Sequence, residues 1–122
     1  MLAKRGLSKR LDPGKWETPG GFLERDEEPL EGLRREMREE LGCEIEVKRL
    51  AAVYTHYRFP LPNLIIVFEI QLLSEPVLKS DEIAEVRWFR AAEIDELDFA
   101  WNCRIRVEDY WRSLAERRWM EK

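Results

Sequence analysis

Three glutamates lie close together in the first half of this 122-residue sequence. Glu36, Glu39 and Glu40 are three and four positions apart, so on a helix their carboxylates would share one face. Like charges at this spacing destabilise a helix by roughly 0.2–0.5 kcal/mol, and such local conflicts tend to occur at functional sites. Hard divalent cations such as Mg²⁺ prefer carboxylate and carbonyl oxygens as ligands. The cluster therefore predicts a metal site.

The same stretch also has a simpler interpretation. Residues 34–40 read RREMREE, and most charge runs of this kind are solvated, salt-bridged helix faces. The spacing of the three glutamates alone does not decide between a metal site and an ordinary surface.

A helix over residues 28–41 would position these glutamates. Its apolar residues recur at helical spacing, Pro29 suits the first turn, and Asp26 or Glu28 can cap the start. Gly42 is placed to end the helix in the left-handed conformation. The apolar positions are Leu30, Leu33, Met37 and Leu41.

The rest of the chain predicts a mixture of strands and helices. Turn signals at residues 11–14 and 19–21 indicate loops and short strands in the first quarter. Residues 45–57 and 64–73 are rich in Val, Ile, Tyr and Phe and predict an antiparallel hairpin. A short strand is expected over 86–89, a short helix or turn over 91–97, and an apolar-faced helix over 104–119. This order indicates an α+β fold or an α/β/α sandwich.

Composition narrows the class of protein. The length suits a single domain covering residues 1–122. The net charge of −4, with both signs interleaved, argues against long nucleic acids as partners. The sequence contains no apolar run long enough to span a membrane and no signal-peptide stretch. Its two cysteines, Cys43 and Cys103, are expected to be free thiols, so a cytoplasmic location is predicted.

A longer motif surrounds the three glutamates. Residues 21–43 fit G-x5-E-x7-R-E-U-x-E-E-x-G-U, where U is apolar, and the chain resembles the Nudix hydrolase family at every position of this box and over nearly its whole length. The resemblance implies an α/β/α sandwich with a mixed sheet and cleavage of the diphosphate linkage of a nucleoside diphosphate derivative. The matched residues are Gly21, Glu27, Arg35, Glu36, Met37, Glu39, Glu40, Gly42 and Cys43.

The resemblance also implies roles for residues of the box. Glu36 and Glu40, with Glu39, would hold Mg²⁺ or Mn²⁺, helped by the backbone carbonyl of Gly20. The metal would orient the diphosphate and activate a water for attack at phosphorus. Arg35 would pair with Glu27 to fix the loop geometry. A carboxylate favoured by the helix dipole is an equally good interpretation of Glu27.

A further acid from the loop before residue 88 is implied as a metal ligand or general base. Glu82 is the candidate because it lies six residues before Trp88. Asp81 and Glu85 compete with it, and an ordinary solvated carboxylate is the alternative to all three.

Substrate contacts are expected outside the box. Arg5 could bind phosphate or flank an edge strand, and Trp16 and Phe59 could stack on a base or belong to the core. Asn102 could read a base edge, although a helix N-cap is the simpler role. His56 is expected to pack or to line a pocket.

The substrate is expected to be a nucleoside triphosphate, most simply a non-standard or oxidised one. ADP-ribose, nucleotide sugars and dinucleoside polyphosphates stay open as substrates. A non-catalytic nucleotide-binding module and a structural protein with an acidic helix stay open as functions.

Three features depart from the family pattern. Family domains open with a strand before the residues matched here by 2–5, so that strand is expected to be missing or short. Unpaired sheet edges favour pairing with another chain, so a homodimer that completes the sheet is predicted. Asp26 replaces a glycine before the box glutamate, and Gly32 is expected to cost the helix up to about 1 kcal/mol relative to alanine.

Overall fold

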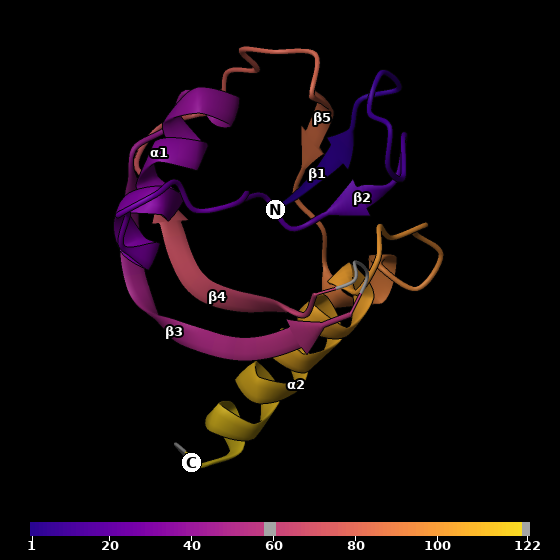
Figure 1. Cartoon of the computed structure of the whole chain (residues 1–122). Coiled ribbons are helices and arrows are strands. Elements are labelled where there is room, and N and C mark those ends of the chain that lie inside the picture. The colour runs from indigo at the N-terminus through magenta and orange to yellow at the C-terminus, as the bar shows by residue number, and fades with distance from the viewer. Residues whose placement is uncertain (58–60, 121–122) are drawn as a thin grey trace.

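The computed structural model describes residues 1–57 and 61–120. It contains three short strands, one long hairpin and two α-helices (Figure 1). In chain order they are β1 (Leu2–Arg5), β2 (Trp16–Glu17), α1 (Pro29–Leu41), β3 (Ile45–His56), β4 (Asn63–Leu72), β5 (Ile83–Arg87), the 3₁₀ turn η1 (Ala91–Glu93) and α2 (Cys103–Met120). This content confirms the predicted α+β class. None of the helices in the described residues is long and apolar enough to cross a membrane.

The strands form two sheets, whereas one mixed sheet was expected. β1 lies between β2 and β5 in an antiparallel three-stranded sheet, and β3 pairs with β4 as an antiparallel hairpin. Among the described residues, β4 has β3 as its one strand partner, so no strand joins the hairpin to the smaller sheet. Figure 1 shows the hairpin curving around one side of the molecule, with the smaller sheet across from it.

The helix that carries the glutamates forms close to its predicted bounds. Pro29 occupies its first turn, and Met37 and Leu41 are buried. Gly42 ends it at φ 61°, and its N–H donates to the carbonyl oxygen of Arg38. The predicted side-chain cap is wrong, because Glu28 occupies the cap position without making a capping hydrogen bond.

The backbone conformation of residue 26 explains why Asp26 can replace the glycine of the family pattern. Asp26 has φ 62°, in the left-handed region that glycine adopts most readily. Asp is one of the few other residues that tolerate this conformation. The substitution therefore keeps the loop conformation at a modest cost.

Three elements after the hairpin differ from their predicted bounds. β5 covers Ile83–Arg87, three residues earlier than expected, because it pairs with β1 from Leu2↔Arg87 to Arg5↔Ile83. The region expected as a short helix or turn forms only η1. α2 begins at Cys103, one residue before its predicted start.

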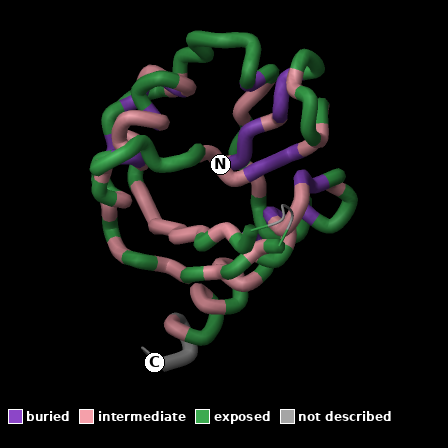
Figure 2. Tube along the Cα trace, in the orientation of Figure 1, coloured by how far each residue is buried: buried purple, intermediate pink, exposed green. Residues whose placement is uncertain are grey.

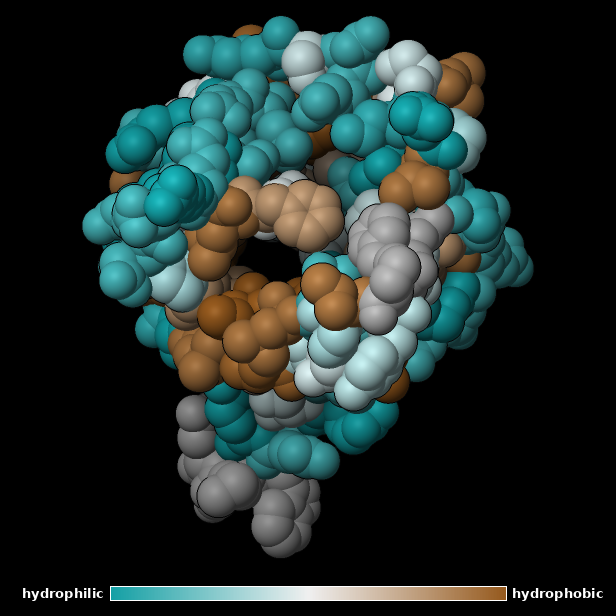
Figure 3. Space-filling model, viewed as in Figure 1, coloured by the Kyte–Doolittle hydropathy of each residue, from teal (hydrophilic) through white to brown (hydrophobic). Residues whose placement is uncertain are grey.

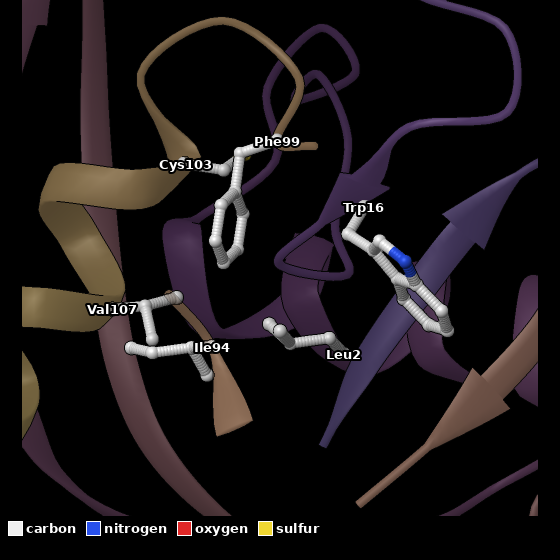
Figure 4. Packing of buried hydrophobic residues seen from close by; sticks show 6 residues of the cluster. All are labelled: Leu2, Trp16, Ile94, Phe99, Cys103 and Val107. Carbon is white, nitrogen blue, oxygen red and sulfur yellow. The ribbon is translucent and has the colours of Figure 1, made fainter. Parts of the chain in front are cut away.

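The buried residues form two clusters, one on each face of the smaller sheet, because the neighbouring residues Leu2 and Ala3 of β1 belong to different clusters. One joins Leu2 and Trp16 to the segment before α2 and to its first turns (Figure 4), and its members are Leu2, Trp16, Ile94, Phe99, Cys103 and Val107. The other joins α1 to β1 and β5 through Ala3, Met37, Leu41, Cys43, Ile45 and Ile83. Figure 2 shows that the hairpin, by contrast, is mostly half-buried or exposed. Of the hairpin residues that the structure describes, Ile45 alone is buried.

Candidate active site

The three glutamates of α1 do not have equal environments. The Glu36 side chain is 14% exposed, and one Oε atom accepts from Arg35 Nη1 at 2.9 Å. Glu39 is largely exposed and accepts from the same Nη1 at 3.1 Å. Glu40 is half-buried. Arg35 therefore draws Glu36 and Glu39 towards itself, while Glu40 faces other acids.

Glu40 lies among carboxylates from three segments of the chain. Its pKa is raised to about 8, first by burial and then by the charges of neighbouring acids. Those neighbours are Glu36 on α1, Glu17 on β2 and Glu82 immediately before β5. The structure thus places the predicted Glu82 near the glutamates of α1 and adds Glu17, which no sequence pattern indicated.

The chemistry of these donors fits a divalent cation better than their spacing does. Within the described part of the chain, no three His, Cys, Asp or Glu side chains are grouped closely enough to surround an ion. Their oxygens are nevertheless the ligands that Mg²⁺ or Mn²⁺ prefers. A cation there would offset the repulsion that raises the Glu40 pKa. The residues present therefore suit a metal, provided that Arg35 shares Glu36 and Glu39 with it.

The loop before α1 approaches these acids closely. A Cβ atom on Gly21 would lie 2.6 Å from the Glu36 carboxylate, so a larger residue at this position would displace that carboxylate. Gly20, predicted to offer its carbonyl to the metal, has φ 151°, which other residues rarely adopt. Both glycines line the same cavity as Glu36 and Glu40.

Arg35 ties this loop to the helix, as predicted. Its Nε and Nη2 donate to the two carboxylate oxygens of Glu27 at 2.7 and 2.9 Å. Nη2 also donates to the carbonyl oxygen of Phe22 at 3.1 Å. Hydrogen bonds from Arg35 are the main cause that lowers the pKa of Glu27 to about 2. Glu27 thus stays ionised and holds the loop.

Gly32 has a packing reason that helix propensity does not show. A Cβ atom there would lie 2.9 Å from a Glu27 carboxylate oxygen and 2.4 Å from Leu23 Cδ2. Leu23 could move aside, but Glu27 is held by Arg35. Glycine at this position therefore lowers the intrinsic stability of the helix but allows the loop to pack closely against it.

Two of the predicted substrate contacts are engaged inside the protein. Arg5 and Glu17 form a buried ion pair at 2.7 Å, and the Arg5 guanidinium lies 4.5 Å from the ring centre of Trp101. Trp16 is buried and meets Phe89 edge-on, with 5.0 Å between ring centres. Both Arg5 and Trp16 are thus explained by packing.

The other two predicted contacts have different outcomes. Phe59 lies outside the described residues. Asn102 directly precedes α2, and its Oδ1 accepts a hydrogen bond from Arg106 Nη2. Asn102 does not line the cavity, whereas Arg106 does. Arg106 is therefore a second cavity residue, after Glu17, that no sequence pattern indicated.

The cavity beside the acids is large. Its volume is about 1300 Å³, above the roughly 300–1,000 Å³ of typical small-molecule sites. Figure 3 shows the opening, bordered by apolar side chains over the hairpin. Its polar lining includes Tyr54, His56 and Arg106. The cavity therefore combines an acidic wall with an apolar one.

Comparison with known proteins identifies the family of this chain. The model of the family described as NUDIX domain matches residues 1–109. A MutT-like protein of Streptomyces ambofaciens is 38% identical over 88 residues, which cover 72% of this chain and 56% of that protein. The nucleoside triphosphatase NudI of Enterobacter sp. (strain 638) is 25% identical over 80% of this chain and 77% of its own length.

A solved structure shares the fold. The crystal structure of a MutT protein from Methanosarcina mazei Go1 matches with a TM-score of 0.78 and 26% identity, covering 95% of this chain and 83% of that one. The family match, the relatives and the glutamate-bearing helix beside a glycine loop all agree. The chain belongs to the NUDIX domain family.

Proposed function

We propose that this chain is a metal-dependent pyrophosphohydrolase that cleaves the diphosphate linkage of a nucleoside diphosphate derivative, with a non-standard nucleoside triphosphate as its substrate. The observation that carries the proposal is the position of Glu36 and Glu40 beside the Gly20-Gly21 loop, on one wall of the large cavity. Family membership supports the same activity.

The residues of the site have two different roles, metal binding and positioning of the carboxylates. Glu36, Glu39 and Glu40, with the carbonyl of Gly20, would hold Mg²⁺ or Mn²⁺, which supplies positive charge to the diphosphate and acidifies a bound water. Arg35 orients the carboxylates by holding both Glu27 and Glu36.

Glu82 is the candidate to accept the proton of the attacking water. It borders the cavity, its charge acts on Glu40, and its side chain is exposed, so it can exchange protons with solvent. Among the described residues, its nearest cation is Lys9, whose Nζ lies 3.8 Å from one Glu82 carboxylate oxygen.

The triphosphate is favoured over the alternative substrates by similarity. The NudI relative is named a nucleoside triphosphatase and aligns with most of this chain. ADP-ribose, nucleotide sugars and dinucleoside polyphosphates have the same linkage and serve as comparison substrates.

A substrate screen tests the activity directly. The protein is incubated with Mg²⁺ or Mn²⁺ and with standard triphosphates, oxidised triphosphates, ADP-ribose, a nucleotide sugar and a dinucleoside tetraphosphate, and the products are separated by chromatography. We expect a triphosphate to yield pyrophosphate together with the nucleoside monophosphate. We also expect loss of turnover in EDTA and recovery when the metal is restored. Binding without turnover of any substrate would instead indicate a nucleotide-binding module.

The oligomeric state forms a second part of the proposal. The β4 edge opposite β3 has no strand partner among the described residues, and β4 borders the apolar side of the cavity. Exposed strand edges favour added strands. A second copy that supplies a segment to this edge would cover both the edge and the cavity wall.

Size-exclusion chromatography with light scattering over a dilution series measures this association. A particle of twice the 14.7 kDa chain mass is expected at micromolar concentration, with a melting temperature that falls on dilution. A well-folded monomer with a concentration-independent melting temperature would contradict the homodimer.

A further inference from the structure

Arg106 is a cation on the cavity wall that the proposed chemistry has not used. It lies in the first turn of α2 and borders the cavity that Glu36 and Glu40 also border. Two side-chain oxygens fix its guanidinium: Nη1 donates to Thr18 Oγ1 at 2.9 Å, and Nη2 donates to Asn102 Oδ1. A guanidinium held from two sides keeps a defined direction, because little rotamer freedom is left.

The charge of Arg106 has no dedicated counter-charge in the described part of the chain. Glu17 is the carboxylate whose charge acts on it, yet Glu17 Oε2 lies 2.7 Å from Arg5 and serves that arginine. The Nε atom of Arg106 is buried and has no hydrogen-bond partner among the described residues. Burial also lowers the pKa of Arg106. A cation in this setting gains more from an added anion than from a neutral acceptor.

Arg106 lies near the loop where the phosphate end of a substrate is expected to bind. Thr18, which accepts from the guanidinium, is two residues before Gly20. Two residues span at most about 7 Å, so Arg106 lies close to the loop that faces Glu36. A substrate whose diphosphate reaches that loop would bring its phosphate oxygens near the guanidinium.

We infer that Arg106 binds a non-bridging phosphate oxygen of the nucleotide and is a substrate-binding residue. Asn102 and Thr18 are positioning residues that aim it. The inference rests on the proposed function, since it takes a nucleotide phosphate as the ligand. A base carbonyl offers the same kind of oxygen acceptor, but the phosphate is favoured because it also supplies the missing negative charge.

The first experiment measures phosphate binding without a base. Isothermal titration calorimetry with inorganic tripolyphosphate and Mg²⁺ compares the wild-type chain with Arg106→Met, Arg106→Lys and Arg112→Met. Arg112 is the matched control because it lies on the same helix, is exposed and does not border the cavity. We expect affinity to fall about 10- to 100-fold in Arg106→Met, less in Arg106→Lys, and not at all in Arg112→Met. Equal affinity of all four proteins would overturn the inference.

The second experiment separates phosphate from base. The base of ATP carries an amino group at C6, where the base of ITP carries a carbonyl oxygen and a proton on the adjacent N1. If Arg106 binds phosphate, Arg106→Met lowers kcat/KM equally for both nucleotides. A loss confined to ITP would assign Arg106 to the base and overturn the phosphate assignment. Thermal unfolding of each variant shows whether it is folded, and Arg106→Lys replaces Arg106→Met in both experiments if the latter is not.

The two hypotheses fail in different ways. If the wild-type chain binds tripolyphosphate through Arg106 but hydrolyses no nucleotide, the proposed function is wrong and the phosphate site stands. If it hydrolyses nucleotides and Arg106→Met changes neither binding nor kcat/KM, the site is wrong and the proposed function stands.

Discussion

Replacement of Glu40 by glutamine is expected to lower kcat about 10²- to 10⁴-fold, the range seen when a group that acts in the transition state is removed. Glutamine has almost the same shape but no negative charge to offer a cation. Glu40 also faces Glu36, Glu17 and Glu82, so its loss weakens the site where the acids meet. The measurement is steady-state turnover of the best substrate over a range of Mg²⁺ concentrations.

The same substitution is expected to stabilise the fold in EDTA. A half-buried carboxylate among like charges is unfavourable, and a neutral amide relieves that repulsion. The melting temperature in EDTA should therefore rise while activity falls, which is the trade-off expected of a functional residue.

Glu31→Gln is the matched control for this prediction. Glu31 is exposed in the first turn of the same helix and does not border the cavity. We expect unchanged turnover and a slightly lower melting temperature, because an acid near a helix N-terminus is favourable. Retention of full activity in Glu40→Gln would show that the metal site or the mechanism lies elsewhere.

Local signals predicted α1 well. Pro29 and Gly42 act through the backbone within one turn of the helix ends, so its bounds differed from the expectation by a single residue. β5 was placed too late because three of the residues 86–89, Val86, Trp88 and Phe89, are apolar. Its actual bounds follow from pairing with β1, more than 75 residues earlier in the chain. A pattern in one segment holds no information about a partner at that distance.

The candidate site shows the same division. The box glutamates and the pairing of Arg35 with Glu27 follow from residues close in sequence. Glu17 and Arg106 reach the cavity through the β1–β2 pairing and the packing of α2, which no local spacing encodes. Gly32 was judged by helix propensity alone, while its value lies in contact with a loop.

Arg35→Lys tests whether the geometry of this loop matters beyond its charge. Arg35 donates at once to Glu27, Glu36 and the Phe22 carbonyl. A lysine ammonium keeps the charge, but its donors start from one nitrogen and cannot span these three acceptors. We expect kcat/KM to fall about 10- to 100-fold and the Mg²⁺ concentration for half-maximal activity to rise by a similar factor, as when a group that orients metal ligands is lost.

Arg38→Lys provides a closely matched control on the same helix. Arg38 forms the same two-pronged pair, with Nε and Nη2 donating to Glu44 at 2.6 and 3.0 Å. Both of these side chains are exposed, and neither borders the cavity. Its replacement should leave both kinetic quantities unchanged, since exposed pairs contribute little. Equal effects of the two substitutions would mean that Arg35, like Arg38, only stabilises the fold and has no specific role at the metal site. A loss confined to Arg35→Lys would mean that the protein uses this arginine to hold Glu36 in the position that a metal requires.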